Sequence, residues 1–282
     1  MRILKTIANG AATAVSSYKL ILVVWVTTLV LTLAVGFPLK SFLNGIFGNS
    51  MAVSRLSDGF DLGIAGDMGK PFGSLMAAAS AGTVLAGTAG FFIMTFFAGG
   101  LFRRFTIAWG GIRISEFLKA SADNFMPFLK IALLMMLIIG GYTLLLIGVP
   151  AILITVLSGA QVPAGNTIYI FWAIWALGMP VWLFVADASR RWVAATGSPK
   201  VFRALGAGFR ALREKFWLSY GTVLAVTVIN ILVAAAIFWF TASATPDRGI
   251  TVFLFFLASQ ALVVLRLMMK AWRYASVCDI AR

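Results

Sequence analysis

Between Lys130 and Asp187 the chain runs for 56 residues without a charged side chain. A helix needs about 20 apolar residues to cross the hydrocarbon core of a bilayer, so this stretch is too long for one crossing. It divides at residues 158–166, where Gly, Pro and Asn supply turn chemistry. The stretch therefore predicts two membrane-spanning helices joined by a short loop.

The composition extends this interpretation to the whole chain. Hydrophobic residues make up 61% of the 282 residues and charged residues 11%, whereas a soluble domain is about a quarter charged. Other charge-free gaps bring the predicted spans to six, at approximately residues 20–39, 74–102, 128–157, 167–186, 217–241 and 250–267. No stretch alternates with the period of two that a barrel strand would show. We expect an all-α fold, a single membrane domain over residues 1–282 built as a bundle of six transmembrane helices.

Basic residues are divided unevenly among the seven segments that the six spans leave outside the bilayer core. From the N-terminus onward these segments hold 3, 3, 5, 0, 7, 1 and 4 Lys and Arg residues. The first, third, fifth and seventh segments thus hold 19 of the 23. By the positive-inside rule, both termini are predicted to be cytoplasmic.

Amphipathic stretches precede the odd-numbered spans. They cover approximately residues 5–17, 113–123 and 198–215, and each leads through an aromatic residue into its span. Such helices lie in the headgroup layer of a membrane. We expect three cytoplasmic interfacial helices, and we interpret the chain as three repeats of interfacial helix, span, outer loop and span.

The third amphipathic stretch carries the candidate contacts to anionic lipid or to a partner. Spacings of three and four residues predict one apolar stripe, formed by Phe202, Leu205, Phe209, Leu212 and Phe216. The candidate cations beside it are Arg190, Arg191, Lys200, Arg203, Arg210 and Arg213. They either bind anionic headgroups on the cytoplasmic side, or bind an anionic partner, or only anchor the fold as the insertion rule requires.

A family resemblance rests on the same region. Residues 186–192 (Ala-Asp-Ala-Ser-Arg-Arg-Trp) and residues 201–210 (Val-Phe-Arg-Ala-Leu-Gly-Ala-Gly-Phe-Arg) resemble uncharacterised bacterial multi-pass membrane proteins, and Asn124-Phe125 before the third span is also similar. These proteins include the membrane domain found beside some glycerophosphodiester phosphodiesterases. The resemblance covers roughly residues 110–230 and implies a fold and a location in the bacterial cytoplasmic (inner) membrane. It implies no activity, because a chain without His cannot supply that enzyme's catalytic histidines.

Small and polar residues mark candidate contacts within the spans. Gly82, Ala86 and Gly90 form a ridge in the second span, suited to close helix packing inside the bundle or to docking of another membrane protein. Asn230 and Gln260 lie near the middle of the fifth and sixth spans and are predicted to pair across that hairpin; the alternative is a substrate contact.

An ion pair is expected within the helix that contains Asp187. Asp187 lies three residues before Arg190 and four before Arg191, which predicts a helical ion pair.

The outer loop, residues 40–73, is rich in apolar residues. We expect it to lie on the membrane, on the bundle or on a partner.

The missing residue types exclude several kinds of chemistry. The chain has no His and a single Cys, so it cannot form a Ser-His-Asp triad, a His-ligated metal site or an internal disulfide. We expect no catalytic residues, no cofactor and no metal site. Nucleic-acid binding is not expected either, because the cations are spread over several membrane-adjacent segments.

These observations predict a non-catalytic, multi-pass inner-membrane protein. Its expected role is that of a structural or accessory subunit, a scaffold that organises a membrane assembly or its lipids. The alternative is a transporter or lipid-moving permease without proton coupling, working through the Gly and Pro breaks near residues 140–150 and 178–180. The absence of ionisable groups at the centres of the spans weighs against that alternative.

Overall fold

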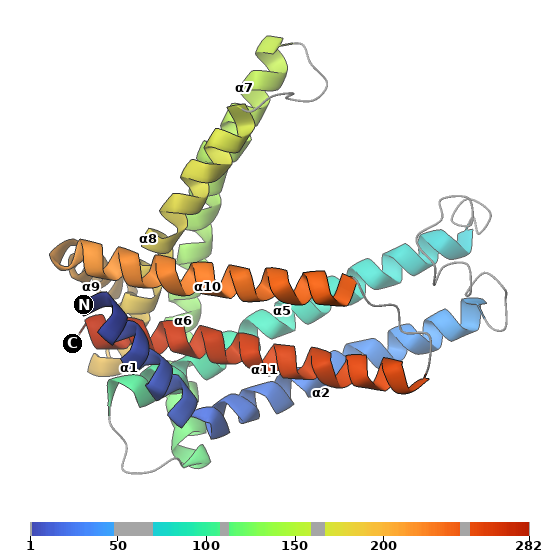
Figure 1. The fold of residues 1–282 in the computed structure, drawn as a ribbon, viewed down its shortest axis with the longest axis horizontal. Helices are drawn as coiled ribbons and strands as arrows, with labels where there is room; N and C mark the ends of the chain where they lie inside the picture. The colour runs from blue at the N-terminus through green and yellow to red at the C-terminus, as the bar shows by residue number, and fades with distance from the viewer. Residues whose placement is uncertain (1, 48–69, 108–112, 159–166, 243–248, 282) are drawn as a thin grey trace. The chain divides into compact units, whose positions relative to one another are not determined.

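The computed structural model describes residues 2–47, 70–107, 113–158, 167–242 and 249–281, and these residues form helices without any strand (Figure 1). The elements are α1 (Arg2–Ser16), α2 (Tyr18–Phe47), α5 (Lys70–Thr106), α6 (Ile114–Thr143), the π-helix η1 (Leu144–Gly148), α7 (Val149–Ser158), α8 (Thr167–Thr196), α9 (Val201–Glu214), α10 (Phe216–Ala242) and α11 (Gly249–Ile280). The predicted all-α fold class is confirmed.

The described residues contain six helices that are long and apolar enough to cross a membrane. They cover Tyr18–Pro38, Met76–Thr106, Ile114–Val156, Tyr169–Thr196, Phe216–Trp239 and Phe253–Ile280. The third of these is continuous through η1, because the π-turn widens the helix without ending it. The protein is therefore a multi-pass membrane protein, with six helices among the described residues that can cross the bilayer.

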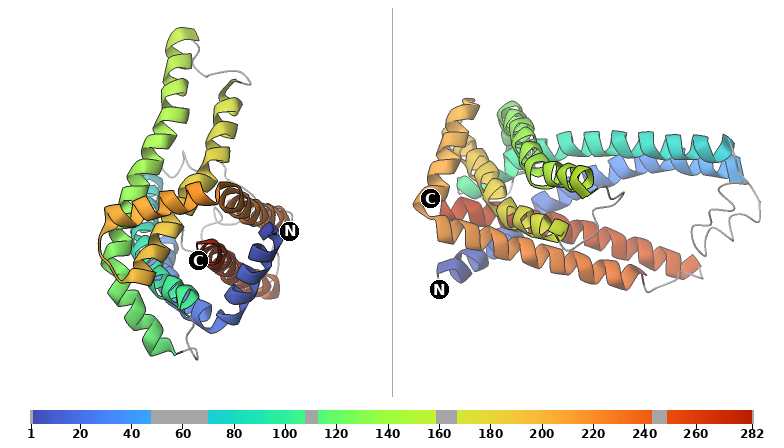
Figure 2. Two further views of the ribbon diagram at one scale, coloured as in Figure 1. Left: turned by 90° about the vertical axis from the view of Figure 1, so that its left-hand side faces the viewer. Right: turned by 90° about the horizontal axis from the view of Figure 1, so that it is seen from above.

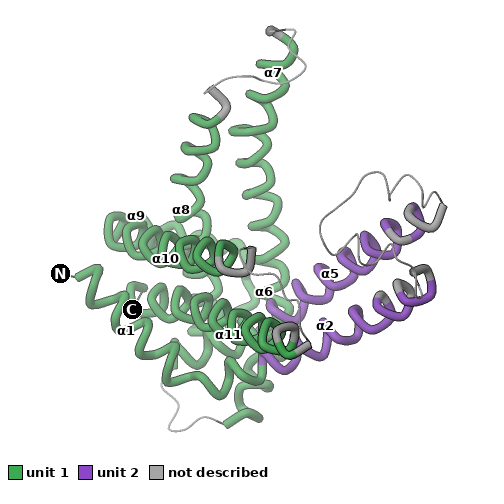
Figure 3. The backbone as a smooth tube through the Cα atoms, turned by 45° about the vertical axis from the view of Figure 1, so that its right-hand side comes forward, with its two compact units in different colours: residues 1–23, 95–282 green, residues 24–94 purple. Residues whose placement is uncertain are grey.

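Two compact units divide the chain (Figure 3). Unit 2, Val24–Met94, holds most of α2 and the first part of α5, and a β carbon on Gly82 would contact Val35 at 3.4 Å. Part of the predicted outer loop, residues 40–73, is helical, because α2 continues to Phe47 and α5 begins at Lys70. The remainder of that loop, residues 48–69, lies outside the described residues.

Unit 1 comprises Met1–Val23 and Thr95–Arg282. Its buried side chains lie mainly in the later part of α5, α8 and α11, in the earlier part of α6 and α10, and on α1, the start of α2 and α9. The fully buried ones include Phe102, Phe117, Phe128, Phe184, Val193, Val223 and Val277. Farther along the same helices large apolar side chains are exposed, such as Leu137, Val156 and Phe238. An apolar helix surface of this kind is suited to contact with lipid. Protein packing is thus concentrated at the ends of the helices that carry the basic residues.

The three amphipathic segments belong to this packed end. Helix α1 lies against α11, where Trp272 Nε1 donates a hydrogen bond of 2.8 Å to the carbonyl oxygen of Ile7 (Figures 1 and 2). Helix α9 lies against α8. The segment at 113–123 is not a separate helix, because α6 continues without a break from Ile114 through Pro127 into the span. The threefold repeat of the chain stays a prediction.

Candidate functional site

Helix α9 presents two different faces. The face toward α8 buries Ala204, Leu205, Gly208 and Leu212. Beside that face, Phe202 is 81% and Phe209 42% exposed. The predicted apolar stripe is thus only partly buried: Leu205 and Leu212 pack on protein, whereas Phe202 and Phe209 remain exposed.

The small residues of α9 explain this division. A β carbon on Gly208 would lie 2.5 Å from Ser189 Oγ and 2.8 Å from the carbonyl oxygen of Val185, so only glycine permits the observed approach of α9 to α8. A helix that docks through glycine and alanine turns its larger side chains away from the contact. Phe209 reaches the edge of the interface, where its ring meets Trp182 edge-to-face with centroids 6.2 Å apart.

The exposed face of α9 also holds cations that were predicted from the sequence. Arg203, Arg210 and Arg213 are exposed on the helix, and Lys200 is exposed just before it. Residues 202, 203, 209 and 210 follow the seven-residue recurrence of a helix, so guanidinium groups and aromatic rings share one surface. We refer to Phe202, Arg203, Phe209 and Arg210 as the α9 surface.

The other two predicted cations lie inside the packed end. Arg190 NH1 lies 3.2 Å from Asp187 Oδ1, so the predicted helical ion pair is confirmed for Arg190. An NH1 group of Arg191 donates to the carbonyl oxygen of Ala281. Both side chains therefore bond to other parts of the protein, whereas Arg203, Arg210 and Arg213 make no hydrogen bond or ion pair with a described residue.

Asp187 is the centre of a buried charge cluster. Its side chain is 0% exposed, and Arg273 Nε donates to Asp187 Oδ2 over 2.8 Å. Arg273 also lies over the ring of Tyr274, 5.5 Å from its centroid. The cluster ties α8 to α11, and the sequence did not indicate it, since the two partners are 86 residues apart.

Cations also cover the carbonyl groups at helix ends. Arg103 NH1 donates to the carbonyl oxygen of Ala194 over 2.6 Å, and Lys215 Nζ donates to that of Ile280 over 2.8 Å. Both acceptors belong to last turns, where carbonyls lack helical partners and the helix dipole favours positive charge. These side chains have a structural role in the packed end.

Hydroxyl groups from two other helices donate to carbonyl oxygens of α8 just before Pro180. Pro180 removes the N–H that would bond the carbonyl of Ala176. Tyr220 on α10 donates to the neighbouring carbonyl of Leu177 over 3.0 Å, and Tyr142 on α6 donates to those of Ile174 and Trp175, each over 3.2 Å. The segment of α8 before Pro180 is thus held by hydrogen bonds from α6 and α10.

The small-residue ridge of the second span belongs to unit 2. A β carbon built on Gly90 would have nothing within 4 Å, whereas one built on Gly82 would lie 3.4 Å from Val35. Ala86 is half-buried. The ridge is therefore packed only in part by the residues that the structure describes.

The amide of Asn230 is used within its own helix. Asn230 Nδ2 donates to the carbonyl oxygen of Val226, one turn earlier, over 2.8 Å. The predicted pair with Gln260 on α11 stays a prediction.

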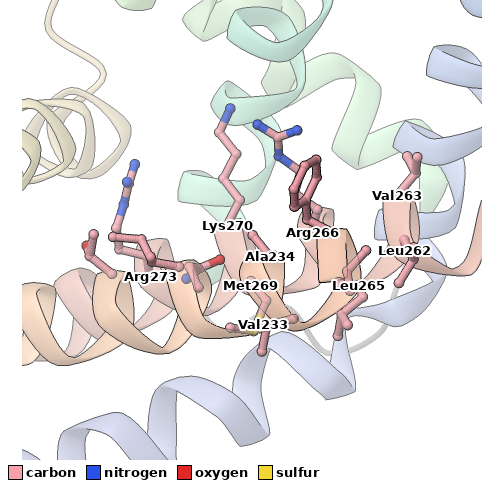
Figure 4. Close-up of a pocket in the computed structure, with 14 residues that line it drawn as sticks. Val233, Ala234, Leu262, Val263, Leu265, Arg266, Met269, Lys270 and Arg273 are labelled. Atoms are coloured by element: carbon pink, nitrogen blue, oxygen red, sulfur yellow. The ribbon is translucent and has the colours of Figure 1, made fainter. Parts of the chain in front are cut away.

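A groove lies between α10 and α11 in unit 1 (Figure 4). Its volume is about 710 Å³, and Asn230 lies in its wall. Three cations of α11 line it, namely Arg266, Lys270 and Arg273. Sequence reasoning missed this set, although the spacing of four and three residues places all three on one helix face.

The chain was compared with protein families, with curated protein sequences and with solved structures. No protein family, no curated protein sequence and no solved structure matches this chain.

Proposed function

We propose that this chain is a non-catalytic protein of the bacterial inner membrane, with both termini in the cytoplasm, that acts as a structural or accessory subunit organising the anionic lipid around a membrane assembly. The α9 surface is the observation that carries this proposal. Its phenylalanines are exposed next to arginines, at the end of the bundle where basic residues gather.

The chemistry of the α9 surface fits the cytoplasmic headgroup layer. Aromatic rings gain by leaving water for the boundary with the acyl chains, and guanidinium groups bind phosphate bidentately. A juxtamembrane cation near an anionic leaflet contributes about 1 kcal/mol. Because Gly208 fixes α9 on α8, little ordering is needed when lipid binds.

Native purification tests the proposal. The chain is extracted in mild detergent, and its bound lipids and proteins are identified. We expect enrichment of anionic over zwitterionic phospholipid and a stoichiometric protein partner, with the enrichment reduced in Arg203→Gln/Arg210→Gln. The matched control is Lys19→Gln/Lys130→Gln, which removes the same charge from two exposed positions off α9. Equal lipid content of the parent and the α9 variant would refute the proposed role of this surface.

The rival function is a permease that moves a lipid without proton coupling. The π-helix at Leu144–Gly148 favours it, since single π-turns occur frequently at functional sites. A lipid-translocation assay in proteoliposomes separates the two functions. An accessory subunit leaves the translocation rate at that of empty vesicles, whereas a permease raises it.

A further inference from the structure

We propose that the groove between α10 and α11 is a binding site for one anionic phospholipid, whose phosphate lies among Arg266, Lys270 and Arg273 and whose acyl chain follows the apolar wall. This inference rests on the proposed lipid-organising function, and it names a second site, separate from the α9 surface.

Two of the three cations in the groove, Arg266 and Lys270, have no counter-charge among the described residues that line it. None of the described residues that line it is acidic. Arg273 is bound to Asp187, which lies outside the lining. Arg266 and Lys270 form no hydrogen bond or ion pair with another described residue. Cations at the edge of an apolar region are costly without a counter-charge, so the groove favours an anionic occupant.

The polarity of the groove changes along its length. Because α10 and α11 are consecutive and antiparallel, Thr227 and Asn230 flank the end that holds Arg273, whereas Ile237 and Phe238 flank the end near Leu262. Residues 262–273 span about 16 Å at the rise of an α-helix. Polar groups and cations thus occupy one part of the groove and apolar side chains the rest. This order matches an amphiphile with an anionic head and an apolar tail.

The side chains are arranged for a shared ligand. Figure 4 shows Arg266, Lys270 and Arg273 extending from the same side of α11. A guanidinium group and an ammonium group one helical turn apart can both donate to the oxygens of one phosphate. A free phosphate would use the cations but leave the apolar wall uncovered, so the structure favours a lipid.

The experiment measures phospholipid binding to the full chain by native mass spectrometry, with phosphatidylglycerol and phosphatidylcholine as probes. Arg266→Gln/Lys270→Gln removes the cationic part of the groove. Ala234→Trp fills its apolar wall without changing charge, and the exposed neighbour Ala235, which does not line the groove, gives the control Ala235→Trp. Lys19→Gln/Lys130→Gln is the charge-matched control.

We expect the two groove variants to bind phosphatidylglycerol about tenfold more weakly, because the first loses charge-assisted hydrogen bonds to the phosphate and the second loses the space for the acyl chain. Both controls should stay within about twofold of the parent. Soluble glycerol phosphate should not compete. Competition by glycerol phosphate, or groove variants that bind as the controls do, would overturn the inference.

The outcomes separate this site from the proposed function. If Arg203→Gln/Arg210→Gln lowers the binding of phosphatidylglycerol and the groove variants do not, the groove is not the site and the proposed function stands. If the parent does not prefer phosphatidylglycerol to phosphatidylcholine, both proposals fail.

Discussion

Gly208 of α9 lies so close to Val185 of α8 that a β carbon on residue 208 would be 2.8 Å from the Val185 carbonyl oxygen. Backbone atoms cannot move aside as the end of a flexible side chain can. The contact therefore depends on glycine at this position, and it decides which face of α9 remains outside.

Replacing this glycine gives the first prediction. We expect Gly208→Ala to destabilise the packed end by about 1–3 kcal/mol, the usual cost of overpacking. Gly206→Ala, two residues earlier on the same helix, should be neutral or stabilise by up to about 1 kcal/mol, because a β carbon there meets nothing within 4 Å. Thermal unfolding in detergent measures both. An equal loss of stability in Gly208→Ala and Gly206→Ala would contradict the close contact of α9 with α8.

The buried charge cluster gives the second prediction. Asp187→Asn leaves Arg190 and Arg273 without their counter-charge, so we expect a loss of about 3 kcal/mol in unfolding free energy. Glu116→Gln removes the exposed partner of Arg113 and should cost about 0–1 kcal/mol. Denaturant titration measures the difference, and a cost at Asp187 no larger than that at Glu116 would refute the structural role of the cluster.

The third prediction concerns the hydroxyl groups that bond α8 before Pro180. Tyr142→Phe and Tyr220→Phe each remove a hydroxyl that donates to α8 carbonyls, and each should cost about 0.5–1.5 kcal/mol. Tyr169→Phe is the control, since Tyr169 is exposed and its hydroxyl has no hydrogen-bond partner among the described residues. Thermal unfolding measures the stability of the three variants. The prediction is wrong if Tyr169→Phe loses as much stability as Tyr142→Phe and Tyr220→Phe.

The single cysteine makes membrane topology easy to test. Cys278 is 1% exposed, so the parent should not react with an impermeant maleimide. We expect Ser41→Cys to be labelled in intact cells, and Arg203→Cys only after permeabilisation. Labelling of Arg203→Cys from outside would reverse the predicted orientation and remove the basis for cytoplasmic lipid contacts.

The number of spans could be predicted because it is a local property. A charge-free stretch of about 20 residues is long and apolar enough to cross the bilayer as a helix, whatever the rest of the chain does. The six apolar helices of the structure agree with this prediction. The ends of the helices could not be predicted in this way. The sixth span was expected to end at residue 267, but α11 continues to Ile280, because α1 and other parts of unit 1 bury residues such as Ala271 and Val277.

The face of α9 shows a second limit. Hydrophobicity alone places Phe202 on the buried stripe, yet its side chain is 81% exposed. Burial on α8 was decided by Gly208 and the residues around it, because close approach of two helices needs small side chains more than large apolar ones. The groove cations were missed for a related reason: their importance depends on which helix lies opposite them.

The first helix of the chain is completed by the last. A β carbon on Gly10 would overlap Ser276 Oγ, and Trp272 bonds the backbone of α1 at Ile7. Helix α1 can therefore reach its packed position only after α11 has been synthesised. A chain truncated before residue 267 would leave the Gly10 face of α1 without the partner that covers it.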